Sequence, residues 1–346
     1  MPLTFEATLR ATLRTRTNLY DPFIQEFERR TGHRWDAPTP QGADEGSVSV
    51  IIPAHDMAYS LPAVLDALAA QQTAARTEVI VVDDGSADGT AAVASGHPLH
   101  PAVVRIPRRS GGAAARNAGV ALATGKTLLF ADADMVLPPH AIADVAARAH
   151  PRLVLLGFRH NVSYQPGPAG RPVVPGWPAD LEADHRVRWR ARAGRMLYTG
   201  ISLDAPVEAR PLDSTDGLRQ LGFGRRYYDW DLPRMVVTAL LAVPRQAVLD
   251  AGGFDPRFGQ EGWGCDDTYL GAALIGLGLM VVPLRQLVGF HINPADEAGT
   301  WQAKLATWPR TIALYQRLLD GPPPHSEADR FRQETEAILA ECEVIR

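Results

Sequence analysis

The chain has 346 residues, of which 46% are hydrophobic and 21% are charged, so it can form one large domain or two smaller ones with a substantial core. Its net charge of -4 argues against a general nucleic-acid binder. Two widely separated cysteines argue against a disulfide framework and a Cys-based zinc site. The N-terminus lacks the apolar core of a secretory signal, and no segment reaches the ~18 apolar residues of a membrane span. We therefore expect a soluble cytoplasmic protein without membrane insertion.

Residues 1–46 differ in pattern from the rest of the chain. Phe23, Ile24 and Phe27 have helical spacing, and Gly32 follows as a stop signal. The segment 36–46 is rich in Pro, Gly, Asp and Glu and reads as a linker. We predict an N-terminal helical extension followed by a linker.

From Ser47 onward, short apolar strands alternate with amphipathic helices. The predicted strands lie at 47–53, 77–82, 101–106, 127–130 and 152–158, and the predicted helices at 60–72, 86–94, 111–125 and 139–149. This alternation is typical of an α/β fold whose mostly parallel sheet has helices on both faces. In such sheets ligands bind beyond the carboxyl ends of the strands.

Residues 159–235 interrupt the alternation. They are rich in Pro, Gly, Arg and Trp, and we interpret them as an insertion packed over the sheet, with a possible helix at 180–196. For Trp177 and Trp189, contact with an anionic or aromatic ligand and packing on the core or exposure to water are equal alternatives. The pattern then resumes with strands at 235–244, 279–283 and 286–294 and helices at 245–254 and 266–278. Helices around 300–320 and 326–343 end the chain.

Three predicted strands end in polar groups. His55 and Asp56 follow the first strand, Asp83 and Asp84 end the second, and the sequence Asp132-Ala133-Asp134 follows a buried apolar run. Neighbouring strand ends share one edge of the sheet, so these carboxylates gather in one cleft, where burial and repulsion are costly without a ligand.

Asp132 and Asp134 are one residue apart at the end of the strand 127–130. On an extended backbone, such side chains point to the same side, so their repulsion requires a cation or a hydrogen-bond donor between them. The alternative is that one of them only caps the helix that follows. The clustering of carboxylates at the other strand ends favours a ligand site.

Four segments, 47–71, 78–90, 108–135 and 252–274, together resemble a family 2 glycosyltransferase of the GT-A fold. The resemblance extends over about 47–157 and 236–292. It implies a nucleotide-sugar-binding half at 47–157, an acceptor-binding and catalytic half at 158–299 that includes the insertion, and C-terminal helices at 300–346.

The resemblance implies that the nucleotide lies along the three strand ends and the helix start at 111–117. Asp84 matches the carboxylate that accepts a hydrogen bond from the base, for which the ring N–H of uracil is a natural donor. The alternatives are a helix cap for Asp83 and a surface salt bridge for Arg116. The implied nucleotide contacts are Pro53, Ala54, His55, Asp56, Asp83, Asp84, Arg116, Asn117, Asp132 and Ala133.

The Asp132-Ala133-Asp134 segment matches the family's Asp-x-Asp motif. By resemblance, Asp132 contacts the ribose, and the metal set comprises Asp132, Asp134 and His291. The divalent cation also binds both phosphates, which would relieve the repulsion between the two carboxylates. Hard oxygen ligands suit Mg²⁺ or Mn²⁺, and an imidazole from His291 favours Mn²⁺. For His291 a purely structural role is the alternative.

The segment "GWGCDDTYL" resembles the family's Trp-Gly-x-Glu-Asp-x-x-Leu motif, with Asp266 in place of Glu. The implied general base is Asp267, which takes a proton from the acceptor hydroxyl. Asp266, Trp263 and Glu261 are the implied acceptor contacts, although core packing is the alternative for Trp263. A base opposite the leaving group implies inversion at the anomeric carbon.

These features predict a metal-dependent, inverting glycosyltransferase of the hexosyltransferase type. It would move one sugar from a UDP-sugar to a small soluble acceptor, such as a secondary metabolite or a saccharide. The alternatives are a catalytically inactive nucleotide-sugar or carbohydrate-binding protein and a retaining glycosyltransferase. A nucleotidyltransferase and a nicotinamide dehydrogenase are disfavoured, because no Gly-rich phosphate loop follows a strand.

Overall fold

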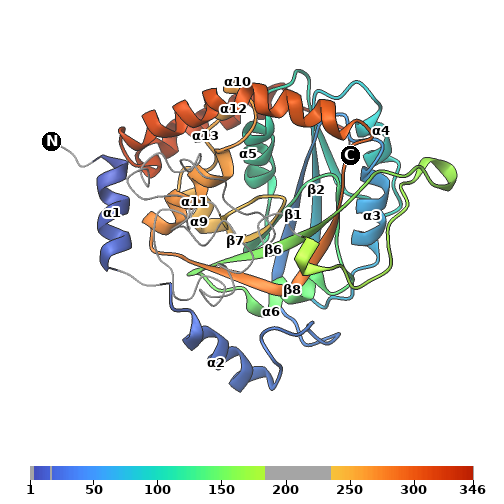
Figure 1. The fold of residues 1–346 in the computed structure, drawn as a ribbon, viewed down its shortest axis with the longest axis horizontal. Helices are drawn as coiled ribbons and strands as arrows, with labels where there is room; N and C mark the ends of the chain where they lie inside the picture. Colours follow the sequence, from blue (N-terminus) through green and yellow to red (C-terminus); the bar gives the residue numbers. More distant parts are fainter. Residues whose placement is uncertain (1–3, 16–17, 184–234, 346) are drawn as a thin grey trace.

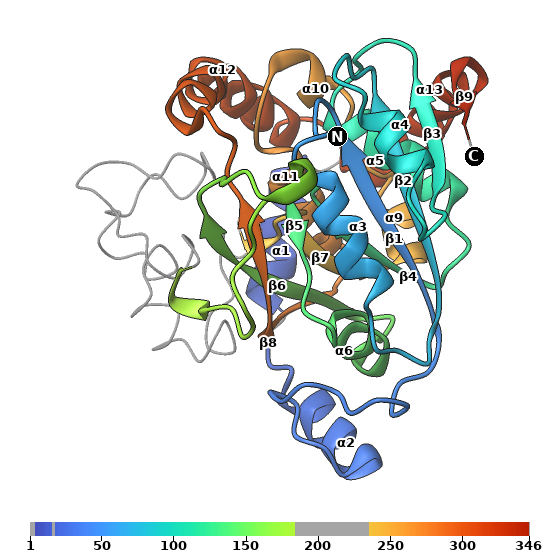
Figure 2. The same ribbon diagram turned by 90° about the vertical axis from the view of Figure 1, so that its right-hand side faces the viewer.

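The computed structural model describes residues 4–15, 18–183 and 235–345. Figures 1 and 2 show a central twisted sheet covered by helices on both faces. The strands are β1 (Ser47–Ala54), β2 (Arg76–Asp84), β3 (Ala102–Ile106), β4 (Thr127–Ala131), β5 (Met135–Val136), β6 (Leu153–Val162), β7 (Leu240–Pro244), β8 (Met280–Ile292) and β9 (Glu343–Val344). The α-helices are α1 (Phe5–Thr15), α2 (Asp21–Thr31), α3 (Leu61–Ala69), α4 (Thr90–Ser95), α5 (Gly112–Leu122), α6 (Ala141–Arg148), α9 (Arg245–Asp250), α10 (Arg257–Glu261), α11 (Asp266–Gly276), α12 (Glu297–Leu319) and α13 (Ala328–Glu341).

Within the described residues the strands form one mixed sheet in the order β5-β8-β6-β7-β4-β1-β2-β3-β9. Strands β1 to β4, β6 and β8 run in one direction, whereas β5, β7 and β9 run against their neighbours. The predicted α/β class with a mostly parallel sheet is therefore confirmed. The same sheet includes strands from both predicted halves of the chain.

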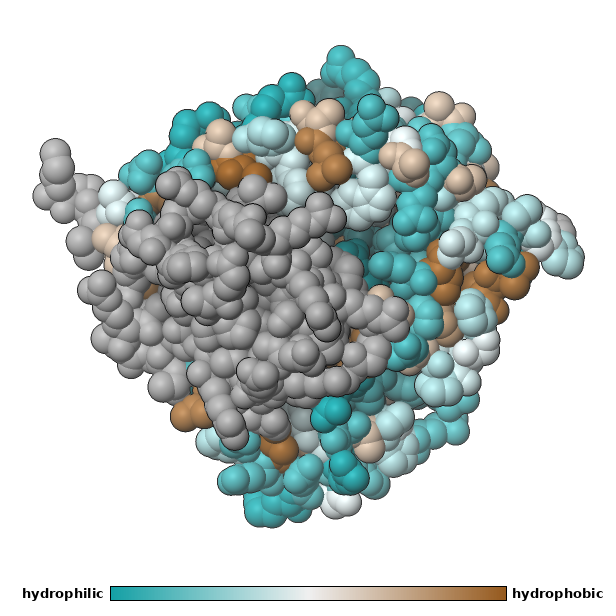
Figure 3. All heavy atoms as spheres, in the orientation of Figure 1, coloured by the Kyte–Doolittle hydropathy of each residue, from teal (hydrophilic) through white to brown (hydrophobic). Residues whose placement is uncertain are grey.

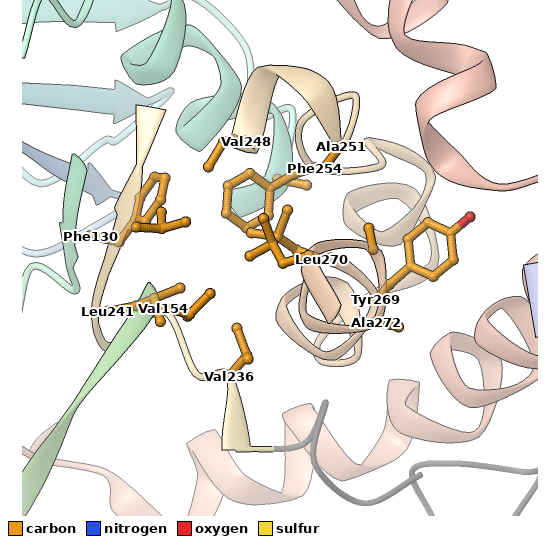
Figure 4. Packing of buried hydrophobic residues seen from close by; sticks show 14 of the residues in the cluster. Phe130, Val154, Val236, Leu241, Val248, Ala251, Phe254, Tyr269, Leu270 and Ala272 are labelled. Carbon is orange, nitrogen blue, oxygen red and sulfur yellow. The ribbon is translucent and has the colours of Figure 1, made fainter. Parts of the chain in front are cut away.

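The alternation of side chains along β1 divides the apolar core into two layers. Val50 and Ile52 pack on one face with α2, α3, α4 and α6, whereas Ile51 packs on the other face with α5, α9 and α11. Figure 4 shows the second layer, in which Phe130 of β4 meets Phe254 and Leu270 of α11 packs nearby. Helix α11 is thus anchored in the core beyond its first turn.

The two strands predicted near the C-terminus form a single strand in the structure. The sequence suggested strands at 279–283 and 286–294, but β8 is continuous from Met280 to Ile292 and pairs with β6, with an irregularity between Leu156 and Phe158. The bulge lets both pieces stay in the sheet without a break. Strand β6 also runs to Val162, so the predicted insertion begins inside a strand.

Part of the described portion of the predicted insertion packs against the sheet. Trp177 packs on Phe290 of β8 with ring centroids 4.5 Å apart, and Ala179 and Leu181 pack against the core. Leu181–Ala183 forms one turn of 3₁₀ helix, while Trp189 and the rest of the possible helix lie outside the described residues. On the face shown in Figure 3, hydrophilic residues predominate among the described ones, and hydrophobic residues form small separate groups.

The N-terminal extension is packed against the sheet. Helix α2 ends at Gly32, as predicted, and the segment predicted as a linker is held by two buried charged side chains. Asp44 accepts hydrogen bonds from the backbone of Ala74 and Ala75. The fully buried Arg148 of α6 donates to the carbonyl oxygens of Trp35 (2.9 Å) and Ala37 (2.7 Å).

We expect Arg148→Met to lower the free energy of unfolding by about 3 kcal/mol, because it leaves Asp144 and several carbonyl oxygens of the extension without their buried donor. Chemical unfolding measures the change. Arg29→Met is the matched control, because Arg29 pairs with Glu26 on the surface and should cost less than about 1 kcal/mol. Equal stability of the two variants would contradict a structural role for Arg148.

Candidate active site

The polar strand ends meet at one edge of the sheet. Strand β1 lies between β2 and β4, and all three are parallel, so their carboxyl ends are neighbours. The prediction that these carboxylates gather at one edge is confirmed by this topology. Their partners, however, differ from one carboxylate to the next.

Asp84 fixes the loop that leads into α5. Its two oxygens accept hydrogen bonds from the backbone N–H groups of Ser110 (2.6 Å) and Gly111 (2.7 Å). Gly111 is needed there, because its φ is +93° and a Cβ atom would lie 2.6 Å from Cα of Gly259. Any contact between Asp84 and a nucleotide base would be added to these bonds.

Asp83 stabilises the turn after β2. Its carboxylate is fully buried, accepts a hydrogen bond from the N–H of Ser86 (3.2 Å) and lies 3.4 Å from Nε of Arg105. Helix α4 begins later, after Gly89, so the alternative in which Asp83 caps that helix is wrong. Asp83 faces these residues rather than an open surface.

The end of β1 forms a turn tied to β2. His55 Nδ1 donates to the backbone carbonyl oxygen of Asp84 (2.7 Å), which leaves Nε2 near a carboxylate oxygen of Asp56 (3.5 Å). Asp56 has a positive φ of 54°, and it accepts a hydrogen bond from the N–H of Ala87 (2.8 Å). Pro53 and Ala54 are the last residues of β1 and lie beside this turn.

Arg116 joins the two ends of the predicted site. Its guanidinium donates to Asp132 (3.1 Å) through one terminal nitrogen and to Asp266 (3.0 Å) through the other. The side chain is only 11% exposed, and burial opposes its charge while the nearby carboxylates favour it, so the pKa of Arg116 stays above its ordinary value. Gly119, one turn later, lets α5 approach Ile51 of β1, because a Cβ there would lie 2.4 Å from that side chain. Arg116 is therefore no surface salt bridge.

The Asn117 side chain links two parts of the fold. Its amide nitrogen donates to the carbonyl oxygen of Phe254 (2.8 Å), and its amide oxygen accepts from the N–H of the same residue (2.8 Å). The side chain is buried and joins α5 to the turn before α10. Both of its hydrogen-bonding groups are thus used inside the protein.

Asp134 lies beside His291, as a metal site at this place requires. Strand β5 pairs Met135 with His291, and this pairing brings a carboxylate oxygen of Asp134 to 3.5 Å from His291 Nε2. The other oxygen, Oδ1, is buried without a hydrogen-bond partner. Burial raises the pKa of Asp134, the imidazole of His291 opposes this rise, and the charge of Asp132 adds to it.

The predicted three-residue metal set is only partly assembled. Asp132 turns to Arg116, and the part of the chain that the structure describes contains no group of three His, Cys, Asp or Glu side chains arranged to hold a metal ion. Asp134 and His291 together offer an unpaired carboxylate oxygen and an imidazole nitrogen, which suit Mn²⁺. A cation here would take its remaining ligands from water or from a bound anion.

The second carboxylate pair begins α11. Asp266 and Asp267 occupy the first turn, where the helix dipole favours negative charge. Burial is the main reason that the pKa of Asp267 rises to about 7, and the adjacent Asp266 adds to the rise while Arg116 opposes it. A carboxylate with this pKa is suited to general base catalysis near neutral pH.

The loop before α11 is pressed against α12. A Cβ at Gly262, where φ is +135°, would lie 2.3 Å from Cβ of Thr307, so this position requires glycine. Trp263 donates its N–H to Thr307 Oγ1 (3.0 Å), and its ring meets those of Trp301 and Trp308 at 5.6 and 5.8 Å. Trp263 is thus packed on α12 rather than in the main core.

Glu261 forms ion pairs with α12. Its side chain faces Arg310 and Arg317 of α12 at 4.0 and 3.9 Å. These two arginines compete with any role in acceptor binding.

Sequence reasoning missed several residues around Asp134. Burial raises the pKa of the Tyr59 hydroxyl, and the charge of Asp134 adds to this rise. Ser60 directly precedes α3, but its hydroxyl does not cap that helix; it donates to the carbonyl oxygen of Ala133 (2.9 Å) and fixes the Asp-x-Asp loop. Tyr59 and Ser60 come three and four residues after Asp56 at a polar strand end, and this is the one signal that could have identified them. Lys304 of α12 had no such signal.

The comparisons with known proteins agree on one protein family. The model of the family described as glycosyl transferase family 2 matches residues 49–193. Validoxylamine A glucosyltransferase from Streptomyces hygroscopicus subsp. jinggangensis (strain 5008) is 30% identical over 256 residues, which are 70% of this chain and 55% of that protein. The protein of the same name from Streptomyces hygroscopicus subsp. limoneus is 30% identical over 256 residues, 70% of this chain and 51% of that protein. The chain spans about half the length of these relatives.

A solved structure has the same fold. Mannosyltransferase PcManGT from Pyrobaculum calidifontis, in complex with GDP-Man and Mn²⁺, matches with a TM-score of 0.50 and 20% identity, over 97% of this chain and 86% of that one. Separately, no helix among the described residues is both long and apolar enough to cross a membrane. Together, the motifs, the sheet topology and these comparisons place the chain in glycosyl transferase family 2, with a GT-A fold.

Proposed function

We propose that this protein is a metal-dependent, inverting glycosyltransferase that moves one sugar from a nucleotide-diphosphate sugar, UDP-linked, to a hydroxyl of a small soluble acceptor. The observation that supports this most is the Arg116 bridge. It places the Asp-x-Asp loop next to Asp266 and Asp267, so a donor-side group and a base-side group share one site. A site of this kind brings a donor and an acceptor together.

On the donor side, Asp134 and His291 would hold a divalent cation, Mn²⁺ in preference to Mg²⁺. The partnerless oxygen of Asp134 supports this assignment, because a buried carboxylate oxygen without a donor is costly unless a ligand satisfies it. When bound, the cation would neutralise negative charge on the leaving diphosphate. Asp132, held by Arg116 and partly exposed, is left for contact with the ribose.

On the acceptor side, Asp267 would accept the proton of the attacking hydroxyl as its oxygen bonds to the anomeric carbon. Asp266 is fixed by Arg116, and its free oxygen could receive a hydrogen bond from an acceptor hydroxyl. The Glu-to-Asp difference at position 266 shortens this arm by one methylene, and the bond to Arg116 offers a reason why a short side chain suits this site.

The acceptor class is drawn from the relatives. Both of those described above are named for glucosyl transfer to validoxylamine A, which supports a small-molecule acceptor such as a secondary metabolite. A protein that binds nucleotide-sugars without catalysis is the alternative. The raised pKa of Asp267 favours the enzyme, because a binding protein has no need of a buried carboxylate that titrates near neutral pH.

Replacing the proposed metal ligand should abolish metal-dependent turnover. We expect Asp134→Asn to lower the rate of UDP-sugar hydrolysis or transfer with Mn²⁺ by a factor of about 100 or more, because the leaving diphosphate loses its cation. Asp250→Asn on α9 is the matched control, since Asp250 is exposed and bonds only to Gln246 among the described residues. Unchanged turnover in Asp134→Asn would refute the metal assignment.

The proposed base predicts how kcat depends on pH. A base must be ionised, so kcat should rise as the pH increases through about 7 and level off above it. Asp267→Asn should lower the rate of transfer by a factor of about 100 or more while donor binding is retained.

NMR of the product tests the stereochemistry, since retention at the anomeric carbon would contradict an inverting mechanism.

The same variant should be more stable than the wild type. The pKa of Asp267 in the folded protein lies above its ordinary value, so its ionisation favours the unfolded state, and its contribution to stability falls as the pH rises from about 4 through 7. Asp267→Asn should therefore melt several degrees higher at pH 8, with a difference that disappears near pH 4. A lower melting temperature at pH 8 would contradict the account of this site.

A further inference from the structure

Helix α12 brings a lysine to the site just described. The chain has 35 Lys and Arg residues, and only Lys126 and Lys304 are lysines. Lys126 is exposed at the start of β4, at the opposite end of the strand from Asp132. Lys304 is half-buried on α12, which follows the carboxyl end of β8 and His291 (Figures 1 and 2).

Lys304 is held in place by aromatic rings. Its Nζ lies 5.4 Å from the ring centroid of Trp263 and 5.5 Å from that of Trp301. Trp301, Lys304 and Trp308 are spaced i, i+3 and i+7, so they share one face of α12, and all three meet Trp263. Cation–π contacts of this kind are worth about 0.5–2 kcal/mol and restrict a flexible side chain.

Hydrogen bonds fix this face of α12 against the loop before α11. Thr307 Oγ1 donates to the carbonyl oxygen of Lys304 (3.0 Å) and accepts the N–H of Trp263 (3.0 Å). Thr311 Oγ1 donates to the carbonyl oxygen of Trp263 (3.0 Å). The position of Lys304 is thereby set relative to Asp266 and Asp267, three and four residues after Trp263.

The ammonium group of Lys304 has no anionic partner in the part of the chain that the structure describes. Among the described residues, no carboxylate lies within ion-pair distance of Lys304, although most cations of this region are paired. Its charge nevertheless acts on Asp134, whose raised pKa it opposes, together with Arg159. Lys304 thus contacts the ring of Trp263 and acts electrostatically on Asp134, the proposed metal ligand, and a compact cation at this position suits a phosphate.

We propose that Lys304 binds the diphosphate of the nucleotide-sugar and stabilises it as a leaving group; this inference rests on the proposed function. In the transfer step, the acceptor oxygen bonds to the anomeric carbon while the bond from that carbon to the diphosphate oxygen breaks. The electron pair goes to the diphosphate, and the acceptor proton goes to Asp267. Lys304 stays protonated and offsets the negative charge that develops on the diphosphate.

The test compares Lys304→Met with wild type, using UDP and GDP, the corresponding monophosphates, and the nucleosides as probes in the presence of Mn²⁺. Methionine keeps an unbranched apolar stem that can pack on the rings, one atom shorter than lysine, and removes the charged ammonium group. For the diphosphate that the wild type binds, we expect Kd to rise about tenfold, with little change for the nucleoside, and kcat to fall. Lys304→Arg should recover part of the loss, and Lys126→Met should behave like wild type.

The outcomes separate this inference from the function on which it rests. If wild type binds neither diphosphate and transfers no sugar, the proposed function fails, and this inference fails with it. If wild type binds but Lys304→Met has unchanged diphosphate affinity and kcat, only the role of Lys304 is overturned. Equal weakening for nucleoside and diphosphate would also overturn it, because the loss would then be structural.

Discussion

The guanidinium of Arg116 lies between Asp132 and Asp266, and the arrangement of the site depends on this contact. Without it, the carboxylates of Asp132, Asp266 and Asp267 would repel one another at partly or fully buried positions, at a high electrostatic cost. Arg116 can reach both partners because Gly119 brings α5 close to β1 and because Asn117 ties α5 to Phe254. The backbone of the core thus determines where the charge is placed.

This arrangement divides the negative charge of the site into two groups with different counterions. Arg116 compensates Asp132 and Asp266, whereas Asp134 has the His291 imidazole beside one oxygen and no partner at the other. The sequence suggested that one cation relieves the repulsion within the Asp-x-Asp motif. The structure instead gives Asp132 a protein donor, so the proposed cation would have only Asp134 to compensate. Asp267 is buried beside Asp266, and Arg116 offsets only part of the resulting rise in its pKa.

Most of the strands and helices, and the edge of the sheet that contains the carboxylates, could be predicted from sequence, because alternating apolar patterns and strand-end polar residues are local signals. The sequence could not predict which residues these side chains contact. Arg116 and Asp266 are 150 residues apart, Asn117 and Phe254 are 137 apart, and Arg148 binds the carbonyl of Trp35 113 residues away. Such pairs are decided by how helices pack on the sheet, and no short motif encodes them. For the same reason the sequence did not identify Lys304, which lies outside the motifs on α12 and meets Trp263 only in the folded structure.

The measurement that tests this account most directly is a crystal structure with Mn²⁺ and UDP bound. The account predicts that Mn²⁺ contacts Asp134, His291 and the diphosphate, while Arg116 keeps its bonds to Asp132 and Asp266. A metal ion bound away from Asp134, or a diphosphate bound without contact to this edge of the sheet, would contradict it.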